Sequence, residues 1–374
     1  MAKTYLDNNA TAPIRPEVIE IMAQSMAHTG NASSIHGFGR ESRRDVEKAR
    51  KYVADLAGTS PNQVIFTSGA TESNNMIVKH YADQKTLISA VEHPAVRDAN
   101  KNATMIPVTR DGAVNLEAYK EMLSSDTGLV SVMLVNNETG VIQPVQEIAR
   151  MAKDAGATVH SDAVQAAGRI PIDFAGLGVD YLSLSAHKFG GPQGVGALIF
   201  RSGLEPPPLL HGGGQERRAR AGTENVAGII GFGEAARIAQ KELGSFQELS
   251  NLREKLEREV KKISPDVIIY GENAPRVANT TCLGLPGVPA ETLLMHLDLA
   301  GIAVSSGSAC SSGVVKTSPV IRAMGASEKE AASTIRISMS WQTRAGDIDH
   351  FLKIWSKIIT RLDEKTTHEK ESSV

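Results

Sequence analysis

The sequence predicts an α/β fold, with a large domain built on a mostly parallel sheet and a smaller α+β domain. Three observations support this prediction. The chain has 374 residues, 41% of them hydrophobic, which is enough to bury more than one core. Short apolar runs alternate with segments of helical periodicity through the first two-thirds of the sequence. After a long helical stretch, this alternation gives way to separate strands and helices.

The large domain is predicted over residues 15–263. Its strands are expected at the apolar runs 64–66, 86–91, 129–135, 158–160, 181–184 and 195–200. Helices are expected at, among others, 41–56, 116–123 and 145–155. This βα alternation is typical of a parallel sheet whose functional side chains lie at the strand ends.

The smaller domain is predicted to combine residues 1–14 with residues 264–374. A helical stretch over about 227–263, rich in Ala, Glu, Lys and Leu, leads the chain into it, with the boundary near Ser264 and Pro265. Its strands are expected at 267–270, 280–285, 302–305 and 334–340, and its last helix at 347–362. The polar tail 364–374 is expected to lack regular structure.

Composition excludes several classes of protein. The formal net charge is −2 and the basic residues are dispersed, which argues against a nucleic-acid-binding face. No apolar run is long enough to cross a bilayer, and the start MAKTYLDNNATAP has no secretory hydrophobic region. Two cysteines do not make a disulfide framework, so the expected location is the reducing cytoplasm.

Three polar segments follow successive predicted strands. In the first, residues 67–74 (TSGATESN), a glycine turn opens a helix whose free amides can hold a phosphate, although such a turn is commonly only a capped helix. In the second, Asp162 can pair with a protonated ring nitrogen and Gln165 can donate to a phenolic oxygen. In the third, a buried Lys188 can lose its proton and condense with an aldehyde.

The ordered set of these segments predicts a site for pyridoxal 5'-phosphate. That cofactor requires a lysine for its aldehyde and an anionic partner for its pyridine nitrogen. Lys188 alone would be read as a surface lysine after a strand. A phosphate loop, an Asp-x-x-Gln and a Ser-x-His-Lys on successive strand ends are hard to obtain otherwise.

Over nearly its whole length, the chain resembles the cysteine desulfurases, which are class V, fold-type I enzymes related to aminotransferases. The resemblance is to the nitrogen-fixation and iron–sulfur-cluster type with a long loop around the catalytic cysteine. The motifs that carry it are TSGATESNN, AVEHPAV, VNNETG, SDAVQ, SAHKFGGPQGVGAL, HGGGQERRARAGTEN and SSGSACSSG. The resemblance implies a fold-type I transferase that uses pyridoxal 5'-phosphate, with a large sheet of the seven-stranded type.

The resemblance also implies roles for individual residues in holding the cofactor. Lys188 would hold its aldehyde covalently and move the substrate Cα proton, while Asp162 would face the pyridine nitrogen and Gln165 the ring oxygen. His93 would stack on the ring and take part in acid–base steps, although before Pro94 it also fits a helix-capping role. The phosphate would be held by Ala70, Thr71, Ser185, His187 and, from the neighbouring subunit, Thr223. A site completed across a two-fold interface implies a homodimer.

The substrate carboxylate requires a cation, and arginine binds a carboxylate through two parallel hydrogen bonds. Arg336 lies on an apolar strand, where an unpaired charge is costly, so we expect it to bind this carboxylate. A structural salt bridge is the alternative. Asn137, in VNNETG, is expected beside both the substrate and the cofactor.

Cys310 is the expected nucleophile. Its surroundings, SSGSACSSG, are small and polar, which favours an accessible and mobile loop. Cys282 lies in an apolar strand and is expected to be structural. The resemblance implies that the Cys310 thiolate attacks the sulfur of L-cysteine, leaving L-alanine and a persulfide. No metal site of its own is expected, although Cys310 could transiently share an iron–sulfur cluster with a scaffold protein.

Sulfur acceptors of this family include iron–sulfur scaffolds and tRNA-thiolation enzymes. The C-terminal extension by which some members dock a scaffold has no evident equivalent here. Three alternative functions stay open. A selenocysteine lyase would share the site, an ordinary class V aminotransferase or lyase would make Cys310 incidental, and a sulfur-relay or scaffold protein would keep the fold with weak catalysis.

Overall fold

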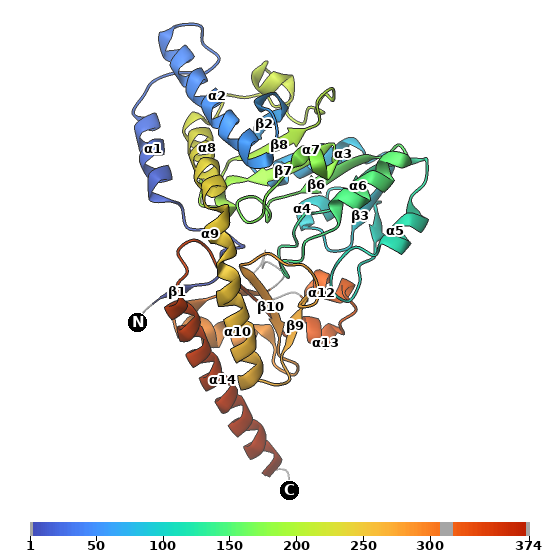
Figure 1. Cartoon of the computed structure of the whole chain (residues 1–374), viewed down its shortest axis with the longest axis vertical. Helices are drawn as coiled ribbons and strands as arrows, with labels where there is room; N and C mark the ends of the chain where they lie inside the picture. The colour runs from blue at the N-terminus through green and yellow to red at the C-terminus, as the bar shows by residue number, and fades with distance from the viewer. Residues whose placement is uncertain (1–2, 307–316, 372–374) are drawn as a thin grey trace.

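The computed structural model describes residues 3–306 and 317–371. The seven-stranded and the four-stranded sheet lie in two parts of the molecule, and a column of three consecutive helices runs from one part to the other (Figure 1). These helices are α8 (Val226–Lys241), α9 (Leu243–Gln247) and α10 (Leu249–Ile263). They occupy the predicted helical stretch 227–263, which is interrupted at Glu242 and Glu248. The weak helix former Gly244 lies in the short middle helix.

The large sheet has seven strands in the order β2-β8-β7-β6-β5-β3-β4. The strands are β2 (Val64–Thr67), β3 (Lys85–Ser89), β4 (Thr104–Ile106), β5 (Thr127–Ser131), β6 (Thr158–Asp162), β7 (Tyr181–Ser185) and β8 (Gly196–Phe200). All pairings are parallel except those of β8, which is antiparallel to β2 and β7. The predicted α/β class is therefore confirmed. The sequence analysis missed β4, a three-residue edge strand with only one buried residue.

Both faces of this sheet are covered, which explains why its strands read as continuous apolar runs. Successive residues enter different cores: Leu87 packs into one cluster and Ile88 into another. The helices of this part, besides α8, are α1 (Pro16–Met26), α2 (Gly37–Ala57), α3 (Ala70–His80), α4 (Pro94–Arg97), α5 (Leu116–Met122), α6 (Val145–Asp154) and α7 (Phe174–Leu177). Three short 3-10 turns are η1 (Pro61–Gln63), η2 (Ala186–Lys188) and η3 (Gln215–Arg218).

The second part holds an antiparallel sheet of order β12-β13-β10-β9 and a parallel pair of β1 with β11. The strands are β1 (Thr4–Tyr5), β9 (Ile268–Tyr270), β10 (Thr280–Gly284), β11 (Ile302–Ala303), β12 (Ser305–Ser306) and β13 (Thr334–Ser338). Its helices are α11 (Ala290–Leu299), α12 (Pro319–Ala323), α13 (Glu328–Ala331) and α14 (Ala345–Glu371).

A separate hydrophobic core fills this second part. It joins Leu6 of the N-terminal segment, Leu256 of α10 and Trp355 of α14. The N-terminal segment thus packs with the C-terminal third of the chain, and α10 shares this core. The division of the chain into domains at residues 14/15 and 263/264 stays a prediction.

The C-terminal helix is longer than expected. Residues 364–374 were expected to lack regular structure, but α14 continues to Glu371. No glycine or proline interrupts the sequence after Gly346, so nothing local ends the helix earlier. No helix among the described residues is long and apolar enough to span a membrane.

Candidate active site

The predicted cofactor residues come together at the carboxyl-terminal ends of strands β2, β6 and β7 of the large sheet. Strand β6 ends at Asp162, and β7 ends at Ser185, directly before the turn that carries Lys188. Strand β2 leads into α3, and Asn74 of that helix donates from Nδ2 to Asp162 Oδ2 at 2.7 Å. This bond fixes the start of α3 over the end of β6.

The N-terminus of α3 is suited to hold an anion. The helix begins at Ala70 with free backbone amides, followed by the exposed Thr71. A Cβ added at Gly69 would meet nothing within 4 Å, so space lies open there. From β7, Ser185 is buried, and His187 Nδ1 lies 3.2 Å from Thr11 Oγ1. The four residues predicted to hold a phosphate within one chain therefore follow two strand ends of the same sheet.

Asp162 is a buried carboxylate held by neutral donors. Besides Asn74, the backbone amide of Val164 donates to its Oδ1 at 3.0 Å. Burial lowers the pKa of nearby His160 to about 4, and this ring lies between two serine hydroxyls. Burial, followed by the charge of Asp162, raises the pKa of Glu92 well above its usual value. Burial disfavours the charged forms of both neighbours, which leaves Asp162 as the group placed to pair with the expected cationic ring nitrogen.

Unsatisfied polar atoms surround this carboxylate. Gln165 donates from Nε2 to Asn9 O at 3.0 Å, but within the described part of the chain its buried Oε1 has no hydrogen-bond partner. The buried Oδ1 of Asn74 also has none. Unpaired buried polar atoms are costly, so a polar ligand at this place would stabilise the site. Together with the space above Gly69, these atoms fit a polar, phosphorylated ring compound such as pyridoxal 5'-phosphate.

Lys188 is prepared to react as a neutral amine. Its Nζ donates to the backbone oxygens of Asn9 at 2.7 Å and Ala10 at 2.8 Å. Burial lowers its pKa to about 7, with further lowering by the charges of Arg336 and Arg169. About half of such lysines are neutral at pH 7, and the neutral amine is the form that condenses with an aldehyde.

His93 caps a helix, as the alternative interpretation allowed, and also lies in the electrostatic field of the site. Its Nδ1 accepts from the amide of Ala95 at 3.1 Å at the start of α4. Burial lowers its pKa, while the charges of Asp162 and Lys188 act on it in opposite directions. Because Nδ1 accepts, the neutral ring carries its proton on Nε2. The capping bond therefore fixes the tautomer.

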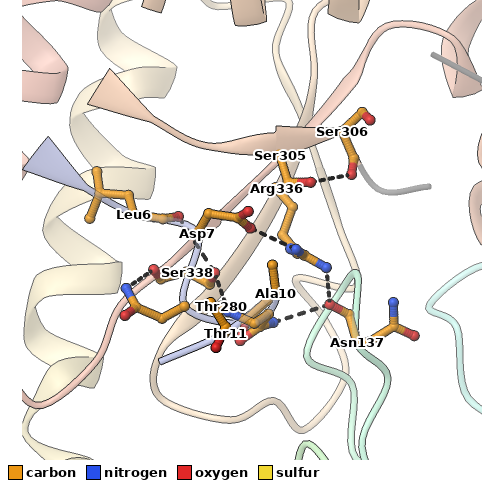
Figure 2. A network of polar contacts seen from close by, with 12 residues as sticks. Leu6, Asp7, Ala10, Thr11, Asn137, Thr280, Ser305, Ser306, Arg336 and Ser338 are labelled. Carbon is orange, nitrogen blue, oxygen red and sulfur yellow. Dashed lines mark hydrogen bonds and ion pairs between the residues drawn. The ribbon is translucent and has the colours of Figure 1, made fainter. Parts of the chain in front are cut away.

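Arg336 lies on β13, at the other side of the site, and its side chain is only 6% exposed. Its Nη2 pairs with Asp7 Oδ1 at 2.7 Å and its Nη1 donates to Asn137 O at 3.0 Å (Figure 2). The structural salt bridge considered for Arg336 is therefore present. Its buried Nε has no hydrogen-bond partner among residues 3–306 and 317–371, so within this part of the chain one strong donor stays available to a ligand.

Asn137 contacts Arg336 through its backbone only. Its carbonyl oxygen also accepts from Asn9 Nδ2 at 3.1 Å, and its side-chain amide points away from Arg336 (Figure 2). Asn136 holds the conformation of this loop, since its Oδ1 accepts from the amides of Glu138 and Thr139 at 2.9 Å each. The fixed loop presents the Asn137 side chain on the side opposite Arg336.

The segment 7–11 (DNNAT) was missed by the sequence analysis as part of the site. This segment supplies the Asp7 carboxylate that pairs with Arg336 and two backbone carbonyls that accept from Lys188. It also supplies Asn9, whose Oδ1 accepts from the buried Arg169 at 2.7 Å. Burial, followed by the charge of Arg336, lowers the pKa of Arg169 to about 9. The available signal was five small or polar residues directly after a short strand, but their partners lie far away in the sequence.

Two predicted residues are not placed in this site. Thr223 lines a small cavity of its own chain together with Thr67 and Ser68, just before α3. Cys310 lies outside the described residues. Cys282 is fully buried in β10, as expected for a structural cysteine, and burial raises its pKa.

The chain matches known proteins over nearly its whole length. The family model of the class-V aminotransferases matches residues 4–351. A cysteine desulfurase from Dictyoglomus turgidum is 42% identical over 99% of this chain and 98% of its own. An IscS-like cysteine desulfurase from Mycobacterium tuberculosis is 40% identical over 96% of both chains. A NifS-like protein from Rickettsia africae has a similar structure, with a TM-score of 0.89, 38% identity and coverage of 96% of this chain and 99% of its own.

The strand ends of the large sheet therefore carry an amine of lowered pKa, a buried carboxylate and a helix start suited to bind an anion. These groups occur on a chain that is similar to cysteine desulfurases over nearly its whole length. The chain belongs to the class-V aminotransferase family, within its cysteine desulfurase group.

Proposed function

We propose that the enzyme takes the sulfur of L-cysteine, releases L-alanine and holds the sulfur as a persulfide on Cys310. The observation that carries this proposal is that one site holds two groups: Lys188, an amine with a pKa of about 7 that the charge of Arg336 helps to lower, and Arg336 itself, a buried cation whose Nε has no partner among the described residues. An amino-acid substrate needs both groups. Its Cα proton must be moved by a base, and its carboxylate must be held by a cation.

Pyridoxal 5'-phosphate, when bound, would supply an aldehyde for amines and an electron-withdrawing ring. Asp162 would hold its ring nitrogen, Gln165 its ring oxygen and His93 its face. The phosphate would lie at Ala70, Thr71, Ser185 and His187. Lys188 would hold the aldehyde at rest and, once released, would move the Cα proton of the substrate. The carbonyls of Asn9 and Ala10 are the acceptors for the released ammonium group.

Residues that flank the segment of Cys310 support sulfur transfer near Arg336. On one side, Ser305 of β12 is in register with Arg336 of β13. On the other side, the Ser318 hydroxyl donates to the buried Glu138 at 2.5 Å, and Glu138 follows Asn137 directly. The described residues on both sides of this segment, Ser305 and Ser318, are therefore held next to the group that would hold the substrate.

The Cys310 thiolate would attack the substrate sulfur. A sulfur–sulfur bond forms as the bond between sulfur and Cβ breaks, and Cβ takes up the electron pair and then a proton. L-alanine leaves, and the sulfur stays on Cys310 for an acceptor such as an iron–sulfur scaffold or a tRNA-thiolation enzyme. We place this reaction in the cytoplasm and in a homodimer, in which Thr223 of each chain contacts the phosphate in the neighbouring chain.

Cys310→Ala and Cys282→Ala, each loaded with the cofactor, test the proposal as a matched pair. With a thiol reductant present to release the persulfide sulfur as sulfide, we expect Cys310→Ala to lose alanine and sulfide formation from L-cysteine together, and Cys282→Ala to keep both. Mass spectrometry of the wild-type enzyme after one turnover should find one added sulfur atom on the peptide of Cys310. Continued sulfide release by Cys310→Ala would exclude the persulfide. Formation of a keto acid in place of alanine would favour an aminotransferase, and a strong preference for selenocysteine would favour a lyase.

A further inference from the structure

We propose that Asp7 is a positioning residue that competes with the substrate carboxylate for Arg336, and thereby sets how tightly the site binds carboxylate ligands. The proposal rests on the proposed function for the role of Arg336. It assigns a task to a residue that lies 329 positions from Arg336 in the sequence and whose side chain, within the described part of the chain, pairs with that arginine.

The hydrogen-bond geometry of Arg336 brings a bound substrate carboxylate next to Asp7. A guanidinium holds a carboxylate with two bonds along one edge of its fork, either Nε with Nη2 or Nη1 with Nη2. Asn137 O accepts from Nη1 and Asp7 from Nη2, whereas Nε bonds to none of the residues that the structure describes (Figure 2). Because Nη2 belongs to both edges and carries two N–H groups, a bidentate ligand either takes the second N–H beside Asp7 or displaces Asp7 from this nitrogen.

The charge of Asp7 also opposes binding of a substrate carboxylate at Arg336. Arg336 and Asp7 form a neutral pair, with side chains 6% and 20% exposed. A substrate carboxylate adds a second anion to one buried guanidinium, and the repulsion between the two anions is only partly screened by water. Without a ligand, Asp7 prevents Arg336 from being an unpaired buried charge. With a ligand, Asp7 weakens binding.

The backbone at Asp7 is held independently of its side chain. The amide of Ser338 donates to Leu6 O at 2.7 Å, and the amide of Leu6 donates to Ala303 O at 2.8 Å. The amide of Ala10 donates to Asp7 O at 3.0 Å. Replacing the carboxylate by an amide of the same shape should therefore change the charge at Arg336 without moving the segment.

Equilibrium titration of the holoenzyme with L-alanine and with ethylamine, followed by the cofactor's absorbance, tests this inference. Ethylamine has the amine and methyl group of L-alanine but no carboxylate. We expect Asp7→Asn to bind L-alanine about tenfold more tightly than the wild type does at low salt, and ethylamine within a factor of two. Asp7→Glu, which restores the charge, should bind L-alanine within about threefold of the wild type.

Two further variants serve as controls. Glu257 is the partner of another buried arginine, Arg276, at 2.7 Å. Glu257→Gln should leave the L-alanine affinity unchanged, since it removes an equivalent carboxylate away from Arg336. Asp7→Ser provides a second neutral side chain and should also tighten L-alanine binding, so that the test does not depend on the folding of one variant.

Unchanged or weaker L-alanine binding in the neutral variants, or an equal effect on ethylamine, would overturn the inference. The proposed function fails separately. Tighter L-alanine binding by Asp7→Asn in an enzyme that releases no sulfide from L-cysteine, even with a thiol reductant present, would refute only the desulfurase proposal. Sulfide release together with an unchanged L-alanine affinity would refute only the competition by Asp7.

Discussion

The cofactor side and the carboxylate side of the site are built in different ways. On the cofactor side, Asp162, Ser185 and Lys188 follow two neighbouring strands of one sheet and lie within 27 residues of one another. On the carboxylate side, Asp7, Asn137 and Arg336 come from three distant segments of the chain. In the first arrangement the sheet fixes the reactive groups. The second depends on an ion pair and a hydrogen bond that join distant segments of the chain.

The largest expected effect tests the cofactor side. Lys188→Ala removes the amine that would hold the aldehyde and move the proton, so we expect L-cysteine turnover to fall about 10³-fold or more. The matched control is Lys153→Ala, which removes an exposed lysine of α6. Alanine formation measures both. Turnover of Lys188→Ala within tenfold of the wild type would contradict the assignment of this side.

A smaller effect is expected on the carboxylate side. Arg336→Gln removes a charged donor to the substrate, which should cost about 2–3 kcal/mol and raise the KM for L-cysteine about 30- to 150-fold. Arg276→Gln, which breaks the pair with Glu257, is the control for loss of a buried arginine. Initial rates over a range of L-cysteine concentrations separate KM from kcat. An equal rise in KM for both variants would show that the effect is structural.

The two sides are expected to communicate through Lys188. Its pKa of about 7 means that the neutral amine increases as the pH rises through 7, so cofactor uptake by the apoenzyme should accelerate about tenfold from pH 6 to pH 8. Absorbance of the lysine-bound cofactor follows this reaction. Since Arg336 lowers the pKa of Lys188 and Asp7 raises it, Arg336→Gln should move the midpoint up and Asp7→Asn should move it down. Unmoved midpoints would show that the sides are electrostatically independent.

The smallest effect concerns the support of Asp162. Asn74→Ala removes one hydrogen bond to this carboxylate, and we expect cofactor affinity to fall about fivefold, which corresponds to about 1 kcal/mol. Asn75→Ala alters the next residue of α3, whose amide bonds to Thr71 O and Ala95 O, away from Asp162. Equilibrium dialysis of the cofactor compares the two. A larger loss of cofactor affinity in Asn75→Ala than in Asn74→Ala would show that Asn75, and not Asn74, supports the site.

This contrast also explains what the sequence could predict. The large sheet and the strand ends that carry Asp162 and Lys188 could be predicted from local patterns, because a strand and the turn after it are formed by consecutive residues. The edge strand β4 was missed because it is short and largely exposed. Asp7 and Arg169 were missed because their importance comes from partners that only the folded chain brings near. Arg336 was found because a charge in an apolar strand is conspicuous, but its partner was not.

The placement of the N-terminal segment has a consequence for synthesis of the protein. Residues 7–10 leave the ribosome early, whereas two of the groups they bind, Thr280 and Arg336, are made more than 270 residues later. The large sheet can form while the chain is still growing, but the substrate side cannot be assembled until the last third has been translated. A nascent chain that stalls before Thr280 would therefore carry an organised cofactor edge without the means to recognise an amino acid.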